Sequence, residues 1–127
     1  MNISILVVDD EPNLRQLLRR MLELGGFRVV EAEDGVDALT KLNHLMPHLI
    51  ILDVMMPDLD GVTLCKMLRN NPRYADLPII MLSGKTQFPA VQAGLEAGAN
   101  RYLCKPITMD ELIQNVRELL PAPLLNA

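Results

Sequence analysis

The chain contains an uninterrupted apolar run that leads directly into a carboxylate. Residues 49–52 are Leu, Ile, Ile and Leu, and Asp53 follows them. Such a run indicates a strand that is buried on both faces, as in the interior of a parallel sheet. A carboxylate at the mouth of a buried strand loses part of its hydration, so it needs a partner or a function. Taken alone, Asp53 is explained equally well as the cap of a turn or a helix.

Strand-like and helical patterns alternate along the whole chain. The other strand-like segments are 3–8, 27–32, 79–82 and 101–104, and the helical patterns cover about 12–24, 36–46, 61–70, 89–97 and 109–120. The segment 27–32 contains Arg28 and Glu31 and is more polar than the first strand-like segment, which suits the edge of a sheet. Fivefold alternation predicts one α/β domain, a doubly wound five-stranded parallel sheet of flavodoxin-like order 2-1-3-4-5 with five helices on its two faces.

Charge and hydropathy exclude several classes of partner. The formal net charge of the chain is −4, and no block of Lys or Arg is present. This argues against nucleic acid or an anionic membrane as the direct partner. The first apolar run is too short for a signal peptide and ends in the acidic residues 9–11, so we expect a cytoplasmic protein. Cys65 and Cys104 lack metal-site spacing and are expected to be small buried residues.

Polar residues follow the predicted strands where ligands bind in sheets of this kind. They are Asp9, Asp10, Asp53, Ser83 and Lys105. Parallel strands bring these carboxyl ends to one edge of the sheet, near the point where the strand order reverses. Two carboxylates about 4 Å apart repel each other by roughly 4 kcal/mol at an effective dielectric near 20. A divalent cation would offset this repulsion, and Mg²⁺ favours a few carboxylates with several retained waters.

The same residue types are those needed to move a phosphoryl group. A carboxylate can attack phosphorus, a metal and an ammonium group can take up charge on the phosphoryl oxygens, and a hydroxyl can donate a further hydrogen bond. Simpler interpretations exist for the individual residues. Asp9 and Asp10 could cap the following helix, and Lys105 could form a plain ion pair with the acidic residues.

Five short segments connect this pattern to a known family. They are Val7–Glu11, Leu52–Gly61, Pro78–Gly84, Gly98-Ala99 and Tyr102–Pro106. With these segments in this order at the strand ends, the chain resembles the receiver domain of two-component response regulators over about residues 2–120. The resemblance implies a receiver domain over residues 1–121, followed over 122–127 by a short C-terminal tail or the start of a linker.

The resemblance implies a phosphoacceptor and a metal site. Asp53 would accept a phosphoryl group from the phosphohistidine of a sensor histidine kinase or a phosphotransfer protein. Asp10 would bind Mg²⁺ directly, and Asp9 would assist through water. Asp53 itself and the backbone carbonyl of Met55 would complete the protein ligands.

The resemblance also implies a switch. Lys105 would contact the phosphoryl group, and the Lys105-Pro106 bond would be cis. Ser83 would turn inward to meet the phosphoryl oxygens, and Tyr102 would follow it. Because phosphorylation adds about −1.5 to −2 charges and three acceptor oxygens, a short hydroxyl such as that of Ser83 can move toward it with its loop. The surface of the fourth helix, fifth strand and fifth helix would then change.

The predicted partners are therefore proteins: the kinase or phosphotransfer protein, and a downstream target or an output domain. A single-domain regulator and a receiver from a longer chain both remain open. Family members that dimerise to bind DNA usually carry Asp immediately before the switch tyrosine. Here that position is Arg101, which argues against the same mode of dimerisation.

Two rival functions are weaker. A phosphate-independent interaction module with this fold would be marked by loss of an acidic residue, the acceptor or the lysine, and none is lost. A phosphatase with an aspartyl-phosphate intermediate would need a second Asp two residues after the nucleophile, where this chain has Met55. We therefore expect no enzymatic activity beyond the chain's own phosphorylation and dephosphorylation.

Overall fold

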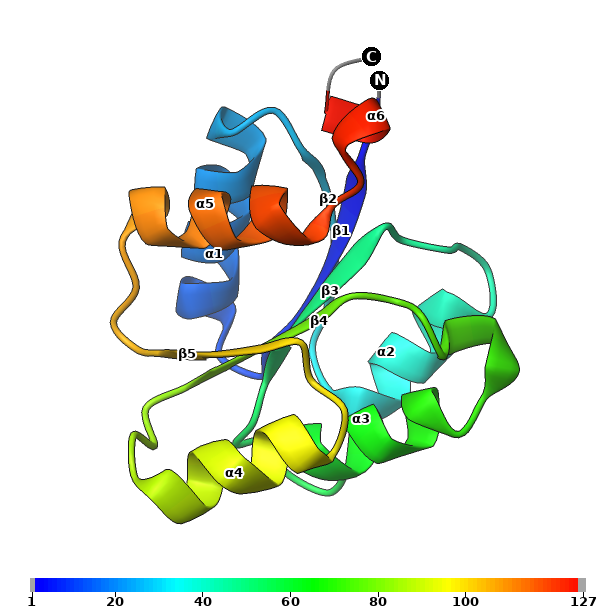
Figure 1. Cartoon of the computed structure of the whole chain (residues 1–127), viewed down its shortest axis with the longest axis vertical. Coiled ribbons are helices and arrows are strands. Elements are labelled where there is room, and N and C mark those ends of the chain that lie inside the picture. Colours follow the sequence, from blue (N-terminus) through cyan, green and yellow to red (C-terminus); the bar gives the residue numbers. More distant parts are fainter. Residues whose placement is uncertain (1, 126–127) are drawn as a thin grey trace.

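The computed structural model describes residues 2–125, and its centre is a five-stranded parallel sheet (Figure 1). The sheet order is β2-β1-β3-β4-β5, as the alternation predicts. Val8 is level with Leu52, and Asp53 is level with Leu82, so the carboxyl ends lie side by side. The strands are β1 (Ser4–Val8), β2 (Arg28–Ala32), β3 (Leu49–Asp53), β4 (Ile79–Ser83) and β5 (Arg101–Cys104).

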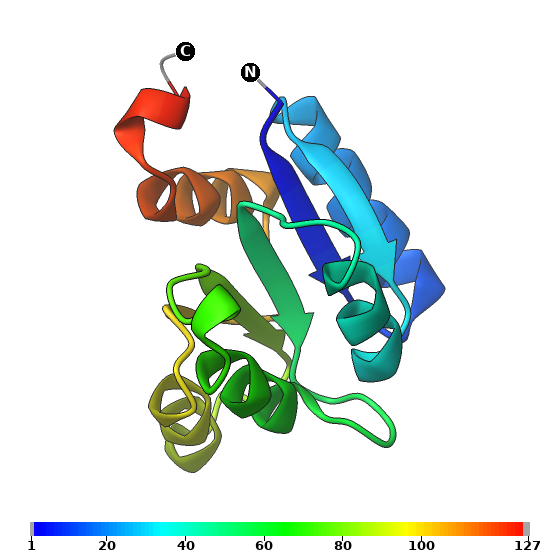
Figure 2. The same ribbon diagram turned by 90° about the vertical axis from the view of Figure 1, so that its right-hand side faces the viewer.

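Helices cover both faces of the sheet (Figures 1 and 2). One face packs against α1 (Pro12–Leu24) and α5 (Met109–Leu119), and the other against α2 (Gly35–Leu42), α3 (Gly61–Arg69) and α4 (Phe88–Glu96). A 3-10 helix, η1 (Pro72–Tyr74), precedes β4, and a short helix, α6 (Ala122–Leu125), follows α5. Neighbouring residues of each strand contribute to opposite apolar cores: Ile5 faces α1 and α5, whereas Leu6 faces the other helices.

Most helix boundaries agree with the sequence. The helix α1 begins at Pro12, as predicted, and at the start of α5 the Glu111 N–H donates to Thr108 Oγ1 at 3.1 Å. The reciprocal bond of a full capping box is not observed in the described part of the chain. One boundary is wrong: α2 ends at Leu42 rather than near residue 46. The approach to Pro47 favours extended backbone, so the last turn is lost and Met46 is 46% exposed.

The helix α4 is loosely packed. Only Gly94 of this helix is buried, and Phe88 at its start is 75% exposed. A side chain at position 94 would lie 2.8 Å from Met81 Sδ and from the ring of Tyr102. The glycine therefore lets the helix lie directly on that ring.

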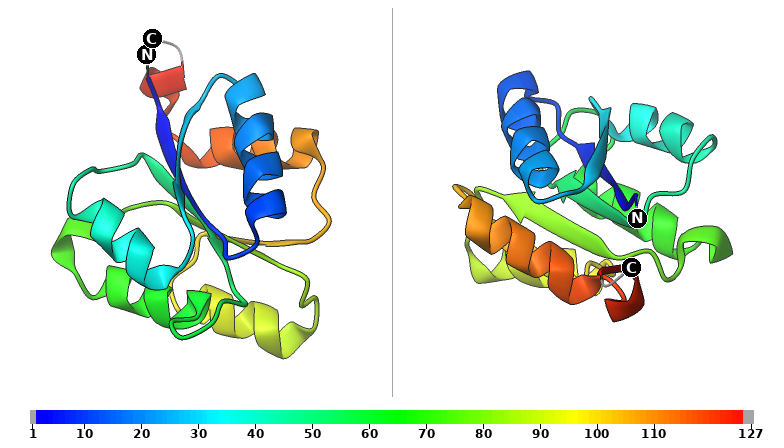
Figure 3. Two further views of the ribbon diagram at one scale, coloured as in Figure 1. Left: turned by 180° about the vertical axis from the view of Figure 1, so that it is seen from behind. Right: turned by 90° about the horizontal axis from the view of Figure 1, so that it is seen from above.

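The prediction that both cysteines are buried is confirmed for Cys65 and wrong for Cys104, which is partly exposed at the end of β5; neither forms a disulfide. Among the described residues, no helix has the length and hydropathy needed to cross a membrane. The first residues of β1 and the helix α6 lie on the same side of the molecule, opposite the carboxyl ends of the strands (Figure 3).

Candidate functional site

The structure brings the predicted acidic residues together at the carboxyl end of the sheet. Asp9 and Asp10 follow β1, and Asp53 is the last residue of β3. One carboxylate oxygen from each lies within 4.8 Å of the others. Asp9 and Asp53 are only 1% and 5% exposed, whereas Asp10 is exposed. We refer to these three residues as the acidic cluster.

Lys105 is the cation that faces this cluster. Its Nζ lies 3.3 Å from Asp53 Oδ1 and 3.7 Å from Asp9 Oδ2, so one ammonium group serves two buried carboxylates. Its backbone N–H donates to the Ser83 carbonyl at 2.8 Å, which fixes the lysine beside the end of β4. The Lys105-Pro106 bond is cis, as the family resemblance implies.

Asp9 carries an acceptor that the protein leaves unsatisfied. Its Oδ1 accepts the Glu11 N–H at 2.9 Å, but its buried Oδ2 has no hydrogen-bond partner among residues 2–125. Leaving such an acceptor without a partner costs about 1–3 kcal/mol. A divalent cation that prefers oxygen ligands would satisfy this oxygen and reduce the repulsion within the acidic cluster, so the residues present fit Mg²⁺.

Burial changes the acidity of Asp53. Loss of water raises the pKa of this carboxyl to about 6, and the charge of Asp9 adds to the effect. Lys105 and the Met55 N–H, which donates to Asp53 Oδ1 at 3.2 Å, act in the opposite direction. Without a cation, the pKa of about 6 means that Asp53 loses its proton around pH 6 rather than near pH 4.

The loop between β3 and α3 packs closely against the end of β3. The Gly61 N–H donates to the Val54 carbonyl at 3.0 Å. A methyl group at position 61 would collide with the Asp53 carbonyl oxygen and would lie 2.8 Å from Val54 Cα. Glycine is thus required for the loop to return this closely to β3. Asp60 then caps α3 by accepting the Thr63 N–H at 2.7 Å.

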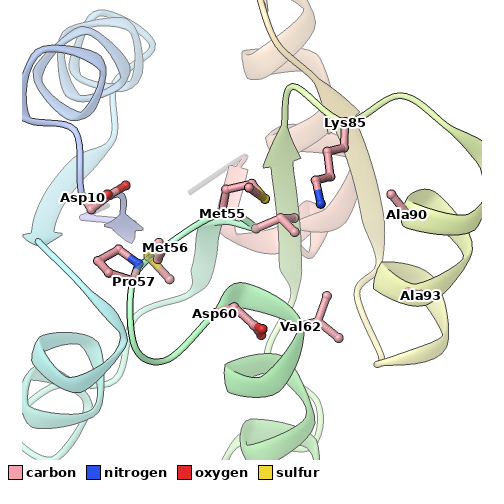
Figure 4. Close-up of a pocket in the computed structure, with 10 residues that line it drawn as sticks. Asp10, Met55, Met56, Pro57, Asp60, Val62, Lys85, Ala90 and Ala93 are labelled. Carbon is pink, nitrogen blue, oxygen red and sulfur yellow. The ribbon is translucent and has the colours of Figure 1, made fainter.

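A pocket of about 580 Å³ opens beside the acidic cluster (Figure 4). Asp10 borders one side of it, and Met55 and Lys85 border the other. The Met55 side chain is 55% exposed, and no hydrogen bond to its backbone carbonyl is found within residues 2–125. The carbonyl predicted to bind metal is therefore free of competing protein donors in that range.

Ser83 and Tyr102 contact the same residue rather than the acidic cluster. The Ser83 Oγ is fully buried and accepts the Lys85 N–H at 3.0 Å. The Tyr102 hydroxyl donates to the Lys85 carbonyl at 2.8 Å. Within the described chain, no hydrogen bond joins the Ser83 hydroxyl to the side chain of Asp53 or of Lys105. The two predicted switch residues are thus joined through the Lys85 backbone.

Our sequence reasoning missed one residue near the site. Arg15 of α1 donates from Nη1 to the Asp9 carbonyl at 2.7 Å and pairs through Nε with Glu31 Oε1 at 2.9 Å. The only signal was Glu31, which interrupts the apolar pattern of the edge strand.

Arg101, the residue that differs from the Asp expected in dimerising family members, is paired within the chain. It donates to Asn115 and Glu118 of α5 at 2.8 and 2.7 Å.

Comparison with known proteins identifies relatives of this architecture. The model of the response regulator receiver domain family matches residues 5–117. Response regulator MprA of Mycobacterium sp. (strain KMS) is 44% identical over 120 residues, which cover 94% of this chain and 51% of the relative. The chain thus spans about half the length of the curated relatives it matches.

Solved structures agree in fold. A Chloroflexus aurantiacus protein assigned as a response regulator superposes with a TM-score of 0.90 at 38% identity, covering 94% of this chain and 98% of that one. Chemotaxis protein CheY4 of Vibrio cholerae gives a TM-score of 0.89 at 32% identity, covering 94% of this chain and all of its own.

Proposed function

The chain belongs to the response regulator receiver family, and we propose that it is a phosphoacceptor switch of a two-component signalling system. The observation that supports this most strongly is the position of Asp53, which ends the central strand beside two further carboxylates and 3.3 Å from the Lys105 ammonium group. Every residue that the transfer chemistry needs is present in the chain.

The proposed reaction is transfer from a phosphohistidine. A carboxylate oxygen of Asp53 attacks phosphorus, an O–P bond forms, and the P–N bond breaks with its electron pair returning to the histidine. Lys105 neutralises charge on the phosphoryl oxygens from the position where it now contacts Asp53. The product is an acyl phosphate on Asp53, and we propose no enzymatic activity beyond making and hydrolysing it.

The acidic cluster is the proposed Mg²⁺ site. Asp10 would be a direct ligand because it is the exposed member, and Asp9 would act through water. Asp53 and the Met55 carbonyl would complete the protein ligands. When bound, Mg²⁺ supplies positive charge that offsets the carboxylates and the incoming phosphoryl group. The unsatisfied Asp9 Oδ2 supports this assignment.

Lys85 is the proposed link between phosphorylation and the surface. The Ser83 hydroxyl would leave the Lys85 N–H and donate to a phosphoryl oxygen. The Lys85 peptide would then shift, and the Tyr102 hydroxyl would lose its acceptor. The exposed faces of α4, β5 and α5 would change together. Arg101 already pairs with Glu118 inside the chain, which supports an interaction mode different from that of relatives with Asp at this position.

A groove beside Lys105 suits the phosphodonor protein. It has a volume of about 290 Å³ and is lined mainly by apolar residues of α1 and of the segment before α5. Leu17 on this groove is 48% exposed. A helix of a sensor histidine kinase or phosphotransfer protein could bury it while presenting a phosphohistidine to Asp53.

The downstream partner is either a separate target protein or an output domain joined after the tail at 122–127, with the receiver unit ending near residue 121. We propose cytoplasmic action, with neither nucleic acid nor membrane bound directly by this domain. A net charge of −4 supports that proposal.

The test is labelling by a small phosphodonor such as acetyl phosphate. With Mg²⁺ we expect one acid-stable, base-labile phosphoryl group per chain, mapped to Asp53 by mass spectrometry. Asp53→Asn and EDTA should each abolish the label, whereas Asp58→Asn, an exposed acid in the following loop, should not. Equal labelling of Asp53→Asn, or in EDTA, contradicts the assignment. A phosphate-independent module, the alternative function, would show no label at all.

A further inference from the structure

Arg15 connects the loop that carries Asp9 and Asp10 to the edge strand β2. Its Nη1 donates to the Asp9 carbonyl at 2.7 Å, and its Nε pairs with Glu31 Oε1 at 2.9 Å. The arginine side chain is only 16% exposed. Both contacts are short and charge-assisted, and a rigid guanidinium group can hold two acceptors at a fixed separation.

The Glu31 carboxylate is itself held in place. Its second oxygen accepts a hydrogen bond from Arg19 Nη1 at 2.7 Å, and its backbone carbonyl accepts one from Lys41 Nζ at 2.8 Å. The hydrogen bond from Arg19 lowers the pKa of Glu31 against the effect of burial, and the bond from Arg15 lowers it further. Glu31 is therefore a fixed anion at neutral pH.

As a result, residues of β2 fix both the backbone N–H and the backbone carbonyl of Asp9. The Asp9 N–H donates directly to the Ala32 carbonyl at 3.2 Å. The Asp9 carbonyl is held through Arg15 by Glu31, the residue before Ala32. That carbonyl belongs to the peptide unit that joins Asp9 to Asp10, so its plane sets the direction in which the exposed carboxylate of Asp10 leaves the chain.

We infer that Arg15 is a positioning residue for the divalent cation: with Glu31 it fixes the Asp9-Asp10 peptide so that both carboxylates meet Asp53. This inference rests on the proposed Mg²⁺-dependent function and adds residues outside the acidic cluster to it. Within residues 2–125, no hydrogen bond or ion pair joins the Arg15 side chain to any of the three carboxylates. It acts through the backbone, and Glu31 balances its charge.

Electrostatics and positioning predict opposite results for removal of Arg15. If only charge mattered, removing a cation near the site would tighten Mg²⁺ binding. If Arg15 positions the peptide, its removal loosens the loop and weakens Mg²⁺ binding. Outer groups that orient metal ligands typically contribute 10–100-fold to affinity, so we expect about a 10-fold weaker affinity in Arg15→Ala.

The experiment is a calorimetric Mg²⁺ titration of the unphosphorylated chain at constant ionic strength. Arg15→Lys keeps the charge but not the two-pronged geometry, so its affinity should fall between wild type and Arg15→Ala. Arg20→Ala is the matched control, because it removes the same charge from an exposed position of α1 and leaves Glu31 and the Asp9 carbonyl untouched. Its affinity should change less than about two-fold.

Urea unfolding of each variant separates the possible outcomes. A purely structural role for Arg15 lowers the unfolding midpoint and leaves the Mg²⁺ affinity of the folded protein unchanged. Affinity in Arg15→Ala that equals or exceeds that of the wild type overturns the inference. If Arg15→Ala does not fold, the affinity of Arg15→Lys is compared with that of Arg20→Ala, and the same criterion applies. Failure of the wild type to bind Mg²⁺ at millimolar concentration contradicts the proposed function instead.

Discussion

The two ends of the central sheet differ in whether their buried polar groups have hydrogen-bond partners. At the carboxyl end, the acidic cluster faces the single ammonium group of Lys105, and within the described structure Asp9 Oδ2 has this ion pair at 3.7 Å but no hydrogen-bond partner. At the amino end, buried polar groups are satisfied by side chains that reach across several segments. The contrast is clearest between Asp9 and Arg69.

Arg69, near the end of α3, serves the amino end of the sheet. Its guanidinium group donates to four backbone carbonyls and to one side-chain amide, which belong to Tyr74, Ala75, Leu77, Gly98 and Asn100. The Asn100 Oδ1 also accepts the Ile79 N–H at 2.8 Å, at the start of β4. Also at the amino end, where β1 begins, the Ser4 N–H donates to His48 Nδ1 at 3.0 Å.

This difference indicates that the two ends of the sheet have different roles, one in stability and one in binding. Satisfied polar groups hold the strands in place, whereas repulsion and an unsatisfied acceptor at the other end leave a site that a cation and a phosphoryl group can complete. Substitutions at the amino end should therefore destabilise the fold without affecting metal binding. Substitutions of the acidic cluster should stabilise the metal-free fold and impair function.

The largest effect is expected for Arg69→Ala. This change leaves several partly buried carbonyls without donors, so the free energy of unfolding should fall by about 3–4 kcal/mol. Urea unfolding measures the fall, and Mg²⁺ affinity of the folded protein should stay unchanged. Arg73→Ala is the control, because Arg73 is exposed and its recorded side-chain contact is with the Tyr74 ring. A loss below 1 kcal/mol in Arg69→Ala would remove the contrast between the two ends.

The next effect concerns Asp53 and depends on pH. Its pKa is raised from 3.8 to about 6 by burial and by Asp9, so the folded state binds the proton more tightly than the unfolded state. The bound proton therefore stabilises the folded state fully below about pH 4, and this stabilisation is lost as the pH rises through 6. Asp53→Asn imitates the protonated carboxyl, so it should stabilise the metal-free protein by about 2–3 kcal/mol above pH 6.

Thermal or urea unfolding between pH 4 and 8 checks this directly. The difference between Asp53→Asn and the wild type should shrink toward zero near pH 4, and the variant should accept no phosphoryl group. A constant difference across that range would mean that folding does not raise the pKa of Asp53, because Lys105 and the Met55 N–H offset burial and Asp9.

A smaller effect is expected for Asp10→Asn. Asp10 is the exposed member of the acidic cluster, so water screens part of its repulsion. The metal-free protein should gain about 1 kcal/mol, and Mg²⁺ should bind more weakly. Asp60→Asn is the matched control at the same end of the sheet, because it removes the same charge while Asn can still accept the Thr63 N–H and cap α3. Destabilisation by Asp10→Asn comparable to loss of a cap would mean that Asp10 is structural.

The sequence predicts the carboxyl end of the sheet better than the amino end. Asp9, Asp10, Asp53 and Lys105 each follow an apolar strand, so the strand order alone brings them to one edge. Arg69 carries no such signal, because its acceptors are backbone carbonyls that any sequence provides.

The sequence also does not predict which way individual side chains point. The Ser83 hydroxyl could have faced the acidic cluster, but it accepts the Lys85 N–H instead. Arg15 falls on a helix in a pattern that suits an ordinary exposed arginine, and only the fold shows that it reaches the Asp9 carbonyl. Local patterns therefore identify which residues gather, and tertiary contacts decide what each one binds.

The smallest effect concerns how long the acyl phosphate lasts. Hydrolysis needs a water in line with the bond to Asp53, approaching through the pocket that Met55 and Lys85 border. The thioether of Met55 obstructs a water without holding it, and Lys85 offers donors but no acceptor. We therefore expect slow dephosphorylation in the wild type. Met55→Asn combined with Lys85→Glu should speed the loss about three-fold, less than 1 kcal/mol in the barrier.

Phosphoryl loss is followed from protein labelled with the same small donor. The matched control is Met67→Asn combined with Lys66→Glu, which makes the same two exchanges on the exposed face of α3. Met67 is 44% exposed, close to the 55% of Met55, so the variants differ chiefly in distance from the pocket. If both double variants decay at the wild-type rate, the two pocket side chains do not control water. If both accelerate equally, general charge rather than position sets the rate. Only acceleration confined to the Met55 and Lys85 pair ties the lifetime of the signal to the carboxyl end of the sheet.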